Sequence, residues 1–108
     1  MGKLDLPQGT LDLLVLRVLA AGEMHGWGIA QRLSVLSKEA LQLQEGTLYP
    51  ALYRMEAKGW IAAEWAQSEN NRKAKYYRLT KIGRKRLDAE KEDWDRLIGV
   101  VDQVLHNA

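Results

Sequence analysis

A proline inside residues 46–59 constrains the fold more than any other feature, because it fixes where a helix can begin. Proline is tolerated only in the first turn of a helix, where the backbone N–H groups have no helical partner. Pro50 therefore predicts a helix that begins close to Gly46 or Thr47. Successive residues turn by about 100°, so this helix has an apolar side and an opposite side of polar and small residues. The apolar side contains Leu48, Ala51, Leu52 and Met55, and the opposite side contains Thr47, Pro50, Tyr53, Arg54, Ala57 and Lys58.

Two further helices are expected before this segment. The helix over residues 10–21 is apolar nearly all round, so we expect its own chain to cover one side and a second element or a second subunit to cover the other. The alternative is a central helix that its own chain wraps completely. A helix over residues 27–36 follows, and residues 37–45 link it to the Pro50 helix. Two tandem helices, of which the second has an accessible polar side, favour a helix-turn-helix over an isolated amphipathic surface helix.

After Gly59, which suits the C-terminal cap of a helix, the pattern changes to a period of two. Apolar residues alternate with others over residues 61–65 and again over residues 75–79, as in β-strands. Residues 67–73 between them are polar and rich in turn formers. This unit is predicted to be a two-stranded hairpin with a long basic tip, and a hairpin in this position is the wing of a winged-helix domain.

Thr80 is a good N-cap for a final helix that extends to about Leu105, roughly 37 Å at 1.5 Å per residue. The apolar stripe of this helix continues along a part of the helix that no other predicted segment of the chain is left to cover. A stripe without an intramolecular partner favours self-association, most simply a two-fold dimer in which this helix meets its mate or the mate's first helix. The residues expected at the dimer interface are Leu13, Leu16, Leu87, Trp94, Leu97, Ile98, Val101 and Leu105.

The formal net charge of +2 hides a strong segregation of charge along the chain. Residues 70–87 contain no carboxylate, yet they hold half of the 16 basic residues, whereas residues 88–108 are mainly acidic. The basic stretch is a candidate contact for phosphates, and the alternative is an ordinary solvated charged surface. The fold class predicted is mainly α with a small β-hairpin. Residues 1–80 are expected to form a winged helix-turn-helix DNA-binding domain, and residues 81–108 a C-terminal dimerisation helix.

Composition argues against several other classes of protein. The apolar share of 46% and the charged share of 28% are ordinary for a globular chain of 108 residues. No apolar run is long enough to cross a bilayer, and residues 1–5 lack the layout of a secretory signal, so a cytoplasmic protein with no membrane partner is expected. The absence of cysteine removes thiolate nucleophiles and thiolate metal sites. The two histidines, His25 and His106, lie far apart, so neither an enzyme, a cofactor nor a metal site is predicted.

The order of elements and three sequence blocks resemble the PadR family of bacterial winged-helix transcriptional regulators. The blocks are residues 26–29 (GWGI), residues 46–59 (GTLYPALYRMEAKG) and residues 72–83 (RKAKYYRLTKIG), and the middle block is the specific one. The resemblance covers nearly the whole chain. It implies a homodimeric repressor that binds a double-stranded DNA operator and is released when an effector binds. An inverted repeat is the operator expected for a two-fold dimer.

The residues expected to contact DNA lie on the Pro50 helix and on the hairpin. They are Gln44, Thr47, Tyr49, Tyr53, Arg54, Asn70, Asn71, Arg72, Lys73 and Lys75. Two of them have alternative interpretations, because Tyr49 also suits packing and Arg54 also suits an ion pair within its own helix. The competing function for the whole fold is a winged-helix module that contacts proteins and not DNA.

Trp94 has a second interpretation, which rests on the resemblance. In multidrug-sensing PadR members an aromatic residue of the final helix helps to form a flat hydrophobic slot at the dimer centre, and Trp94 occupies a similar place. The resemblance therefore implies a small hydrophobic or aromatic effector stacked on Trp94. The alternative is that Trp94 only fills the dimer core.

Overall fold

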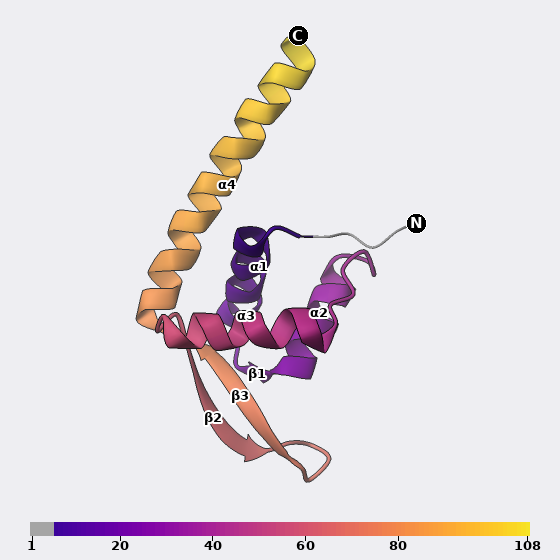
Figure 1. The fold of residues 1–108 in the computed structure, drawn as a ribbon, viewed down its shortest axis with the longest axis vertical. Coiled ribbons are helices and arrows are strands. Elements are labelled where there is room, and N and C mark those ends of the chain that lie inside the picture. The colour runs from indigo at the N-terminus through magenta and orange to yellow at the C-terminus, as the bar shows by residue number, and fades with distance from the viewer. Residues whose placement is uncertain (1–5) are drawn as a thin grey trace.

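Residues 6–108, which a computed structural model describes, form three short helices, a small sheet and one long helix (Figure 1). The expectation about a secretory signal concerned residues 1–5, which lie outside the described residues. No helix within residues 6–108 is both long and apolar enough to cross a membrane. The elements in chain order are α1 (Gln8–Ala20), β1 (Met24–His25), α2 (Gly26–Leu36), α3 (Glu45–Ala57), β2 (Ile61–Gln67), β3 (Lys73–Leu79) and α4 (Lys81–Asn107).

Helix α1 is the centre of the core. It contacts α2, α3, β3 and α4, and Leu16 on it has no exposed surface. Because four elements of the same chain meet around α1, other elements and not a second subunit cover its second side. Gln8, Gly9 and Arg17 of α1 stay exposed, so the wrapping is nearly but not fully complete. Leu13 and Leu16, which were predicted to lie at a dimer interface, are covered by their own chain, and so is Leu87 of α4.

The helix boundaries follow from local capping. Helix α3 begins at Glu45, with Gln44 at the N-cap, so Pro50 lies in the second turn and not in the first turn that the sequence predicted. Gly59 after its end adopts φ +77° as a left-handed residue. At the start of α4 the Oγ1 atom of Thr80 accepts a hydrogen bond of 3.0 Å from the N–H of Gly83, so the predicted cap is confirmed. The Nδ1 atom of His25 caps α2 in the same way, 2.9 Å from the N–H of Gly28.

The sheet has three strands in the order β1-β3-β2, all antiparallel. The sequence predicted only the hairpin, in which Ile61 pairs with Leu79 at one end and Gln67 with Lys73 at the other. The added strand β1 places His25 beside Tyr76 of β3. A strand of two residues has no room for an alternating pattern, which is why the period of two did not reveal it. Its consequence is that the start of α2 is tied to the hairpin.

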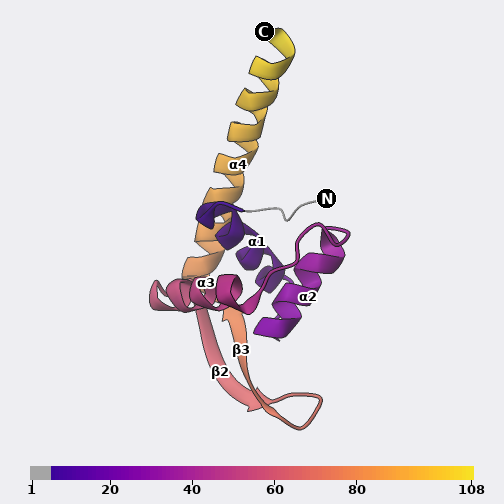
Figure 2. The same ribbon diagram turned by 45° about the vertical axis from the view of Figure 1, so that its right-hand side comes forward.

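Helix α4 leaves the domain from a tightly packed junction. The Thr80 hydroxyl lies 2.6 Å from the carbonyl oxygen of Gly59 and 3.0 Å from that of Trp60. Two cations lie over the Trp60 ring, with Lys58 Nζ and the Arg86 guanidinium carbon each 4.8 Å from its centroid. Figures 1 and 2 both show α4 projecting away from the other elements, and residues 91–108 are exposed along it.

Candidate nucleic-acid interface

Helix α3 divides into the two sides that the sequence predicted. Leu48, Ala51, Leu52 and Met55 are buried against the core. The opposite side is open to solvent, and Tyr53 at its middle has 75% of its surface exposed. The other exposed residues of this side are Thr47, Pro50, Ala57 and Lys58, with Gln44 exposed just before the helix. The open side offers hydroxyl, amide and ammonium groups on a convex surface that is free of core contacts.

Arg54 lies differently from the expectation. Its Nη2 atom is paired with the Asp12 carboxylate of α1, and its Nε atom is buried without a hydrogen-bond partner among the described residues. Asp12 is the buried charged residue of the core; desolvation raises the pKa of its carboxyl above the ordinary 3.8, although the Arg54 guanidinium opposes that rise. The alternative considered for Arg54 was a pair within its own helix, and the partner is instead on α1. Arg54 therefore connects α3 to the central helix.

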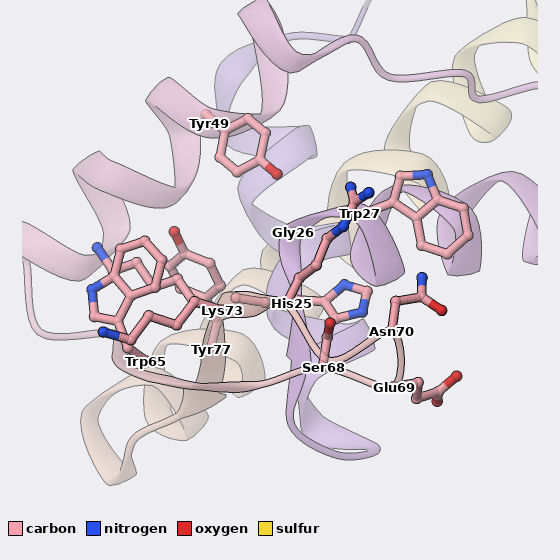
Figure 3. Close-up of a pocket in the computed structure, with 13 residues that line it drawn as sticks. His25, Gly26, Trp27, Tyr49, Trp65, Ser68, Glu69, Asn70, Lys73 and Tyr77 are labelled. Carbon is pink, nitrogen blue, oxygen red and sulfur yellow. The ribbon is translucent and has the colours of Figure 1, made fainter.

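Tyr49 lies at the edge between the buried and exposed sides of α3. A Cβ atom at Gly26 would come within 2.7 Å of the Tyr49 ring, so the ring lies directly over the backbone at the start of α2. The side chain is nevertheless 42% exposed, and Figure 3 shows its hydroxyl directed toward the space above His25. The packing expected for Tyr49 is therefore present, and its partial exposure leaves contact with DNA as a prediction.

The hairpin formed by residues 61–79, called the wing below, presents most of its predicted residues at the tip. The tip is closed by a hydrogen bond of 2.7 Å from the Ser68 N–H to the Arg72 carbonyl, with Asn71 in a left-handed conformation at φ +61°. Asn tolerates this conformation better than most residues. The predicted residues exposed at the tip are Asn70, Asn71, Arg72 and Lys73, and the carboxylate Glu69 beside them is exposed as well.

Lys75 is the predicted wing residue that turns back toward α3. Its Nζ atom lies 3.0 Å from the Oε1 atom of Glu56, and this hydrogen bond raises the pKa of the Lys75 amine. The ion pair connects the wing to α3. Lys75 therefore has a carboxylate partner within the protein, in contrast to Arg72 and Lys73 at the tip, which form no ion pair within residues 6–108.

The basic stretch of residues 70–87 does not form one continuous patch. Arg72 and Lys73 lie at the tip of the wing, whereas the second half of the stretch lies on the first turns of α4, at the opposite end of the hairpin (Figure 1). Within that half, Arg86 pairs with Glu90 and covers Trp60. The fold thus separates the basic residues into a cationic wing tip and a second group at the α4 junction.

An open groove of about 650 Å³ runs between the start of α2, the start of α3 and the wing (Figure 3). Trp27 and Trp65 lie at opposite ends of it, and each has 64% of its surface exposed. Sequence reasoning missed His25, Trp27 and Trp65 as candidate site residues. The period of two places Trp65 on the same face of β2 as Ile61 and Ala63, which suggests a buried position. The burial of β2 decreases toward the tip of the wing, so this face is exposed at Trp65.

The apolar stripe of α4 is uncovered in the single chain. Trp94 is 39% exposed and Val101 is 42% exposed, and the other predicted interface residues on this part of the helix are Leu97, Ile98 and Leu105, all exposed. These five residues remain available for contact with a partner, unlike Leu13, Leu16 and Leu87. An exposed apolar stripe of this length is the feature of the molecule that most needs a partner.

Comparison with known proteins connects this architecture to a family. Residues 15–89 match the family described as the transcriptional regulator PadR-like family. The chain belongs to the PadR-like family. The match spans the second half of α1, helices α2 and α3, the sheet and the first turns of α4, and the predicted winged-helix architecture is confirmed. This PadR-like chain is a transcriptional regulator and not an enzyme.

Relatives with known names agree with this assignment. Transcriptional regulator Rv3488 of Mycobacterium tuberculosis is 30% identical over 93 residues, which are 86% of this chain and 83% of that protein. The crystal structure of a PadR family transcription regulator from Clostridium difficile R20291 is 33% identical, with a TM-score of 0.76 over 88% of this chain and 97% of that one. A transcriptional regulator from Clostridium thermocellum is 28% identical, with a TM-score of 0.81 over 89% and 93% of the two chains.

Proposed function

We propose that this PadR-like regulator binds a double-stranded DNA operator through α3 and the wing. The observation that carries the proposal is the exposed side of α3, which adjoins a wing tip whose cations Arg72 and Lys73 have no carboxylate partner among the described residues. A helix with its buried side held by a core and its other side free fits the major groove of B-DNA, and a cationic loop beside it fits the phosphates.

The proposed contacts divide into those that choose the sequence and those that hold the backbone. Thr47 and Tyr53 on the exposed side of α3, with Gln44 just before it, would meet base edges. Tyr49 would contact the backbone through its accessible hydroxyl. The wing residues Asn70, Asn71, Arg72 and Lys73 would meet phosphates or the adjacent minor groove. Arg54 and Lys75, which are paired with Asp12 and Glu56, act mainly by orienting α3 and the wing.

The proposal includes a homodimer formed through α4. Pairing two copies of α4 about a two-fold axis would cover the exposed stripe that contains Trp94, Leu97, Ile98, Val101 and Leu105. Two DNA-binding domains related in this way prefer an inverted repeat whose half-sites lie about one helical turn, or a multiple of it, apart. A dimer bound to such an operator blocks other proteins from binding the same DNA, so repression is the expected outcome.

The proposed control of DNA binding is a planar hydrophobic effector that stacks on Trp94 near the two-fold axis. Support comes from the partial exposure of Trp94 on the apolar stripe. The measurement is quenching of tryptophan fluorescence by planar aromatic compounds, compared between the wild type and a Trp94→Ala variant that remains dimeric. Quenching that persists in this variant would assign the effect to another tryptophan and leave Trp94 as packing.

A gel-shift titration tests the proposed function directly. The probe is the duplex immediately upstream of the encoding gene, with a shuffled duplex of the same length and composition as the control. We expect a discrete shifted band with the upstream duplex at protein concentrations well below those that shift the shuffled one. Failure to shift any duplex at low ionic strength would contradict DNA binding and favour the alternative of a protein-contact module.

A further inference from the structure

We propose that the groove between α2, α3 and the wing seats the sugar-phosphate backbone of one strand of the bound duplex. In this role His25 is a hydrogen-bond donor to phosphate, and Trp27 and Trp65 are contacts for the sugars. The inference rests on the proposed function, because it names a further part of the same DNA-binding surface. It assigns a role to three residues that lie outside α3 and outside the basic tip.

The tautomer of His25 follows from its cap. Its Nδ1 atom accepts the hydrogen bond from the Gly28 N–H, so a neutral ring carries its proton on Nε2. The ring is held on two sides, with centroids 6.1 Å from Trp27 and 5.3 Å from Tyr76, and β1 pairs with β3 at this residue. Within residues 6–108 the Nε2–H forms no hydrogen bond. It is therefore a fixed donor in the groove that has no partner within the described chain.

The donors around the groove match a phosphodiester. The Tyr49 hydroxyl points into it from α3 (Figure 3), and Arg72 and Lys73 line it from the wing. Glu69 is the carboxylate among the lining residues, and its side chain points away from His25 and Tyr49 (Figure 3). The charge that the groove complements is therefore negative. Neutral donors and cations converging on an open channel are the usual backbone contacts of DNA-binding proteins.

The shape of the groove selects an extended occupant. Trp27 and Trp65 lie at its opposite ends (Figure 3), so a small planar molecule cannot stack between the two indoles. A DNA strand alternates charged phosphates with apolar sugar faces, and this alternation matches a groove lined by cations, neutral donors and two exposed indoles. The groove also continues onto α3 through Tyr49. A strand lying in it would thus adjoin the major groove in which α3 is proposed to sit.

The test compares the affinity of variants for the operator duplex by fluorescence anisotropy. Trp27→Ala and Trp65→Ala change exposed side chains, and His25→Asn keeps a good N-cap residue while it removes the Nε2–H. Each variant is expected to weaken binding about five- to tenfold, which corresponds to about 1 kcal/mol of binding free energy. The tryptophan variants should leave the salt slope unchanged, because indoles release no counterions. Leu36→Ala, another exposed apolar residue outside the groove, is the matched control and should bind like the wild type.

A methylphosphonate scan of the operator identifies the phosphate. Replacing one phosphate at a time with a neutral methylphosphonate should weaken the wild type at several positions per half-site, and His25→Asn should lose sensitivity at one of these positions alone. If the wild type binds the operator but all three variants bind equally well, the groove proposal is overturned while the proposed function stands. The groove proposal is also overturned, and the proposed function again stands, if a planar aromatic carboxylate quenches the fluorescence of Trp65 and the DNA affinity of Trp65→Ala is unchanged. If the wild type binds no duplex, the proposed function fails first.

Discussion

At the scale of single residues, a few positions fix how the helices are held. Arg54 is the clearest case, because a residue on the exposed sector of α3 by periodicity is instead paired with Asp12 on the central helix. Helical periodicity predicts the direction in which a side chain leaves the helix. It does not predict where the charged end of a long side chain such as arginine lies. The partner lies 42 positions away in sequence, so no local pattern predicts it.

The Asp12–Arg54 pair leads to a prediction about pH. Burial raises the pKa of the Asp12 carboxyl above 3.8 in the folded state, so the folded protein binds this proton more tightly than the unfolded chain does. Its contribution to stability is complete below 3.8 and is lost as the pH rises through the folded pKa. The free energy of unfolding of the wild type minus that of Asp12→Asn should therefore fall as the pH rises above 3.8 and through the folded pKa. Urea unfolding at a series of pH values measures it, and a difference that grows with pH would contradict the direction.

Gly83 gives a prediction about stability. A Cβ atom there would lie 1.9 Å from the backbone carbonyl oxygen of Trp60, at the junction from which α4 leaves the domain. Gly83→Ala should destabilise the protein by about 3 kcal/mol, the upper part of the range for overpacking, because backbone must move.

Gly99, also in α4, is the matched control for Gly83. A Cβ atom at Gly99 meets nothing within 4 Å, so Gly99→Ala should stabilise the helix by up to about 1 kcal/mol through its better helix propensity. Thermal unfolding of both variants measures the contrast. Equal midpoints for the two variants would contradict the close approach of α4 to Trp60.

At the scale of elements, the sequence predicted most of the fold because its strongest patterns are local. Pro50 and the apolar period placed α3 to within two residues, and Thr80 placed the start of α4. The features that were missed depend on contacts between distant segments. Strand β1 is defined by its pairing with β3, and the burial of the apolar residues of α1 depends on four elements meeting there. The groove was missed for the same reason, since its lining residues come from three separate segments.

The wing gives a prediction about salt dependence. Arg72→Gln combined with Lys73→Gln should weaken binding to all duplexes and reduce the slope of log affinity against log salt by about one for each phosphate that the wing no longer neutralises. Lys38→Gln combined with Lys91→Gln removes the same charge from exposed positions outside the wing and α3, and it should keep the wild-type slope. A wild-type slope in the wing variant would refute the assignment of the tip to phosphates.

Helix α4 gives a prediction about assembly. Val101→Asp places a charge on the apolar stripe and should convert the dimer to monomers without unfolding the domain, because Val101 is 42% exposed in the single chain. Gln103→Asp introduces the same charge on the other side of the helix and should leave the dimer intact. Sedimentation velocity distinguishes the two species. Dimers that persist in Val101→Asp would mean that the stripe is not the interface.

At the scale of the whole molecule, the junction around Trp60 connects the proposed dimer helix to the proposed DNA-binding surface. Thr80, Gly83 and Trp60 hold the start of α4 against the end of α3, and the Arg54 and Lys75 ion pairs hold α3 to α1 and to the wing. A change in how two α4 helices pack would therefore move both copies of α3 as rigid attachments. This would provide a mechanical route from the proposed effector at Trp94 to the spacing of the two proposed DNA-binding surfaces.

Hydroxyl-radical footprinting of the operator complex, with the number of chains per duplex counted in the same samples, tests the central claim most directly. We expect two chains per duplex and two symmetric protected regions, whose centres lie about one helical turn or a multiple of it apart. Protection of a single half-site by one chain, or no protection at low ionic strength, would contradict the account.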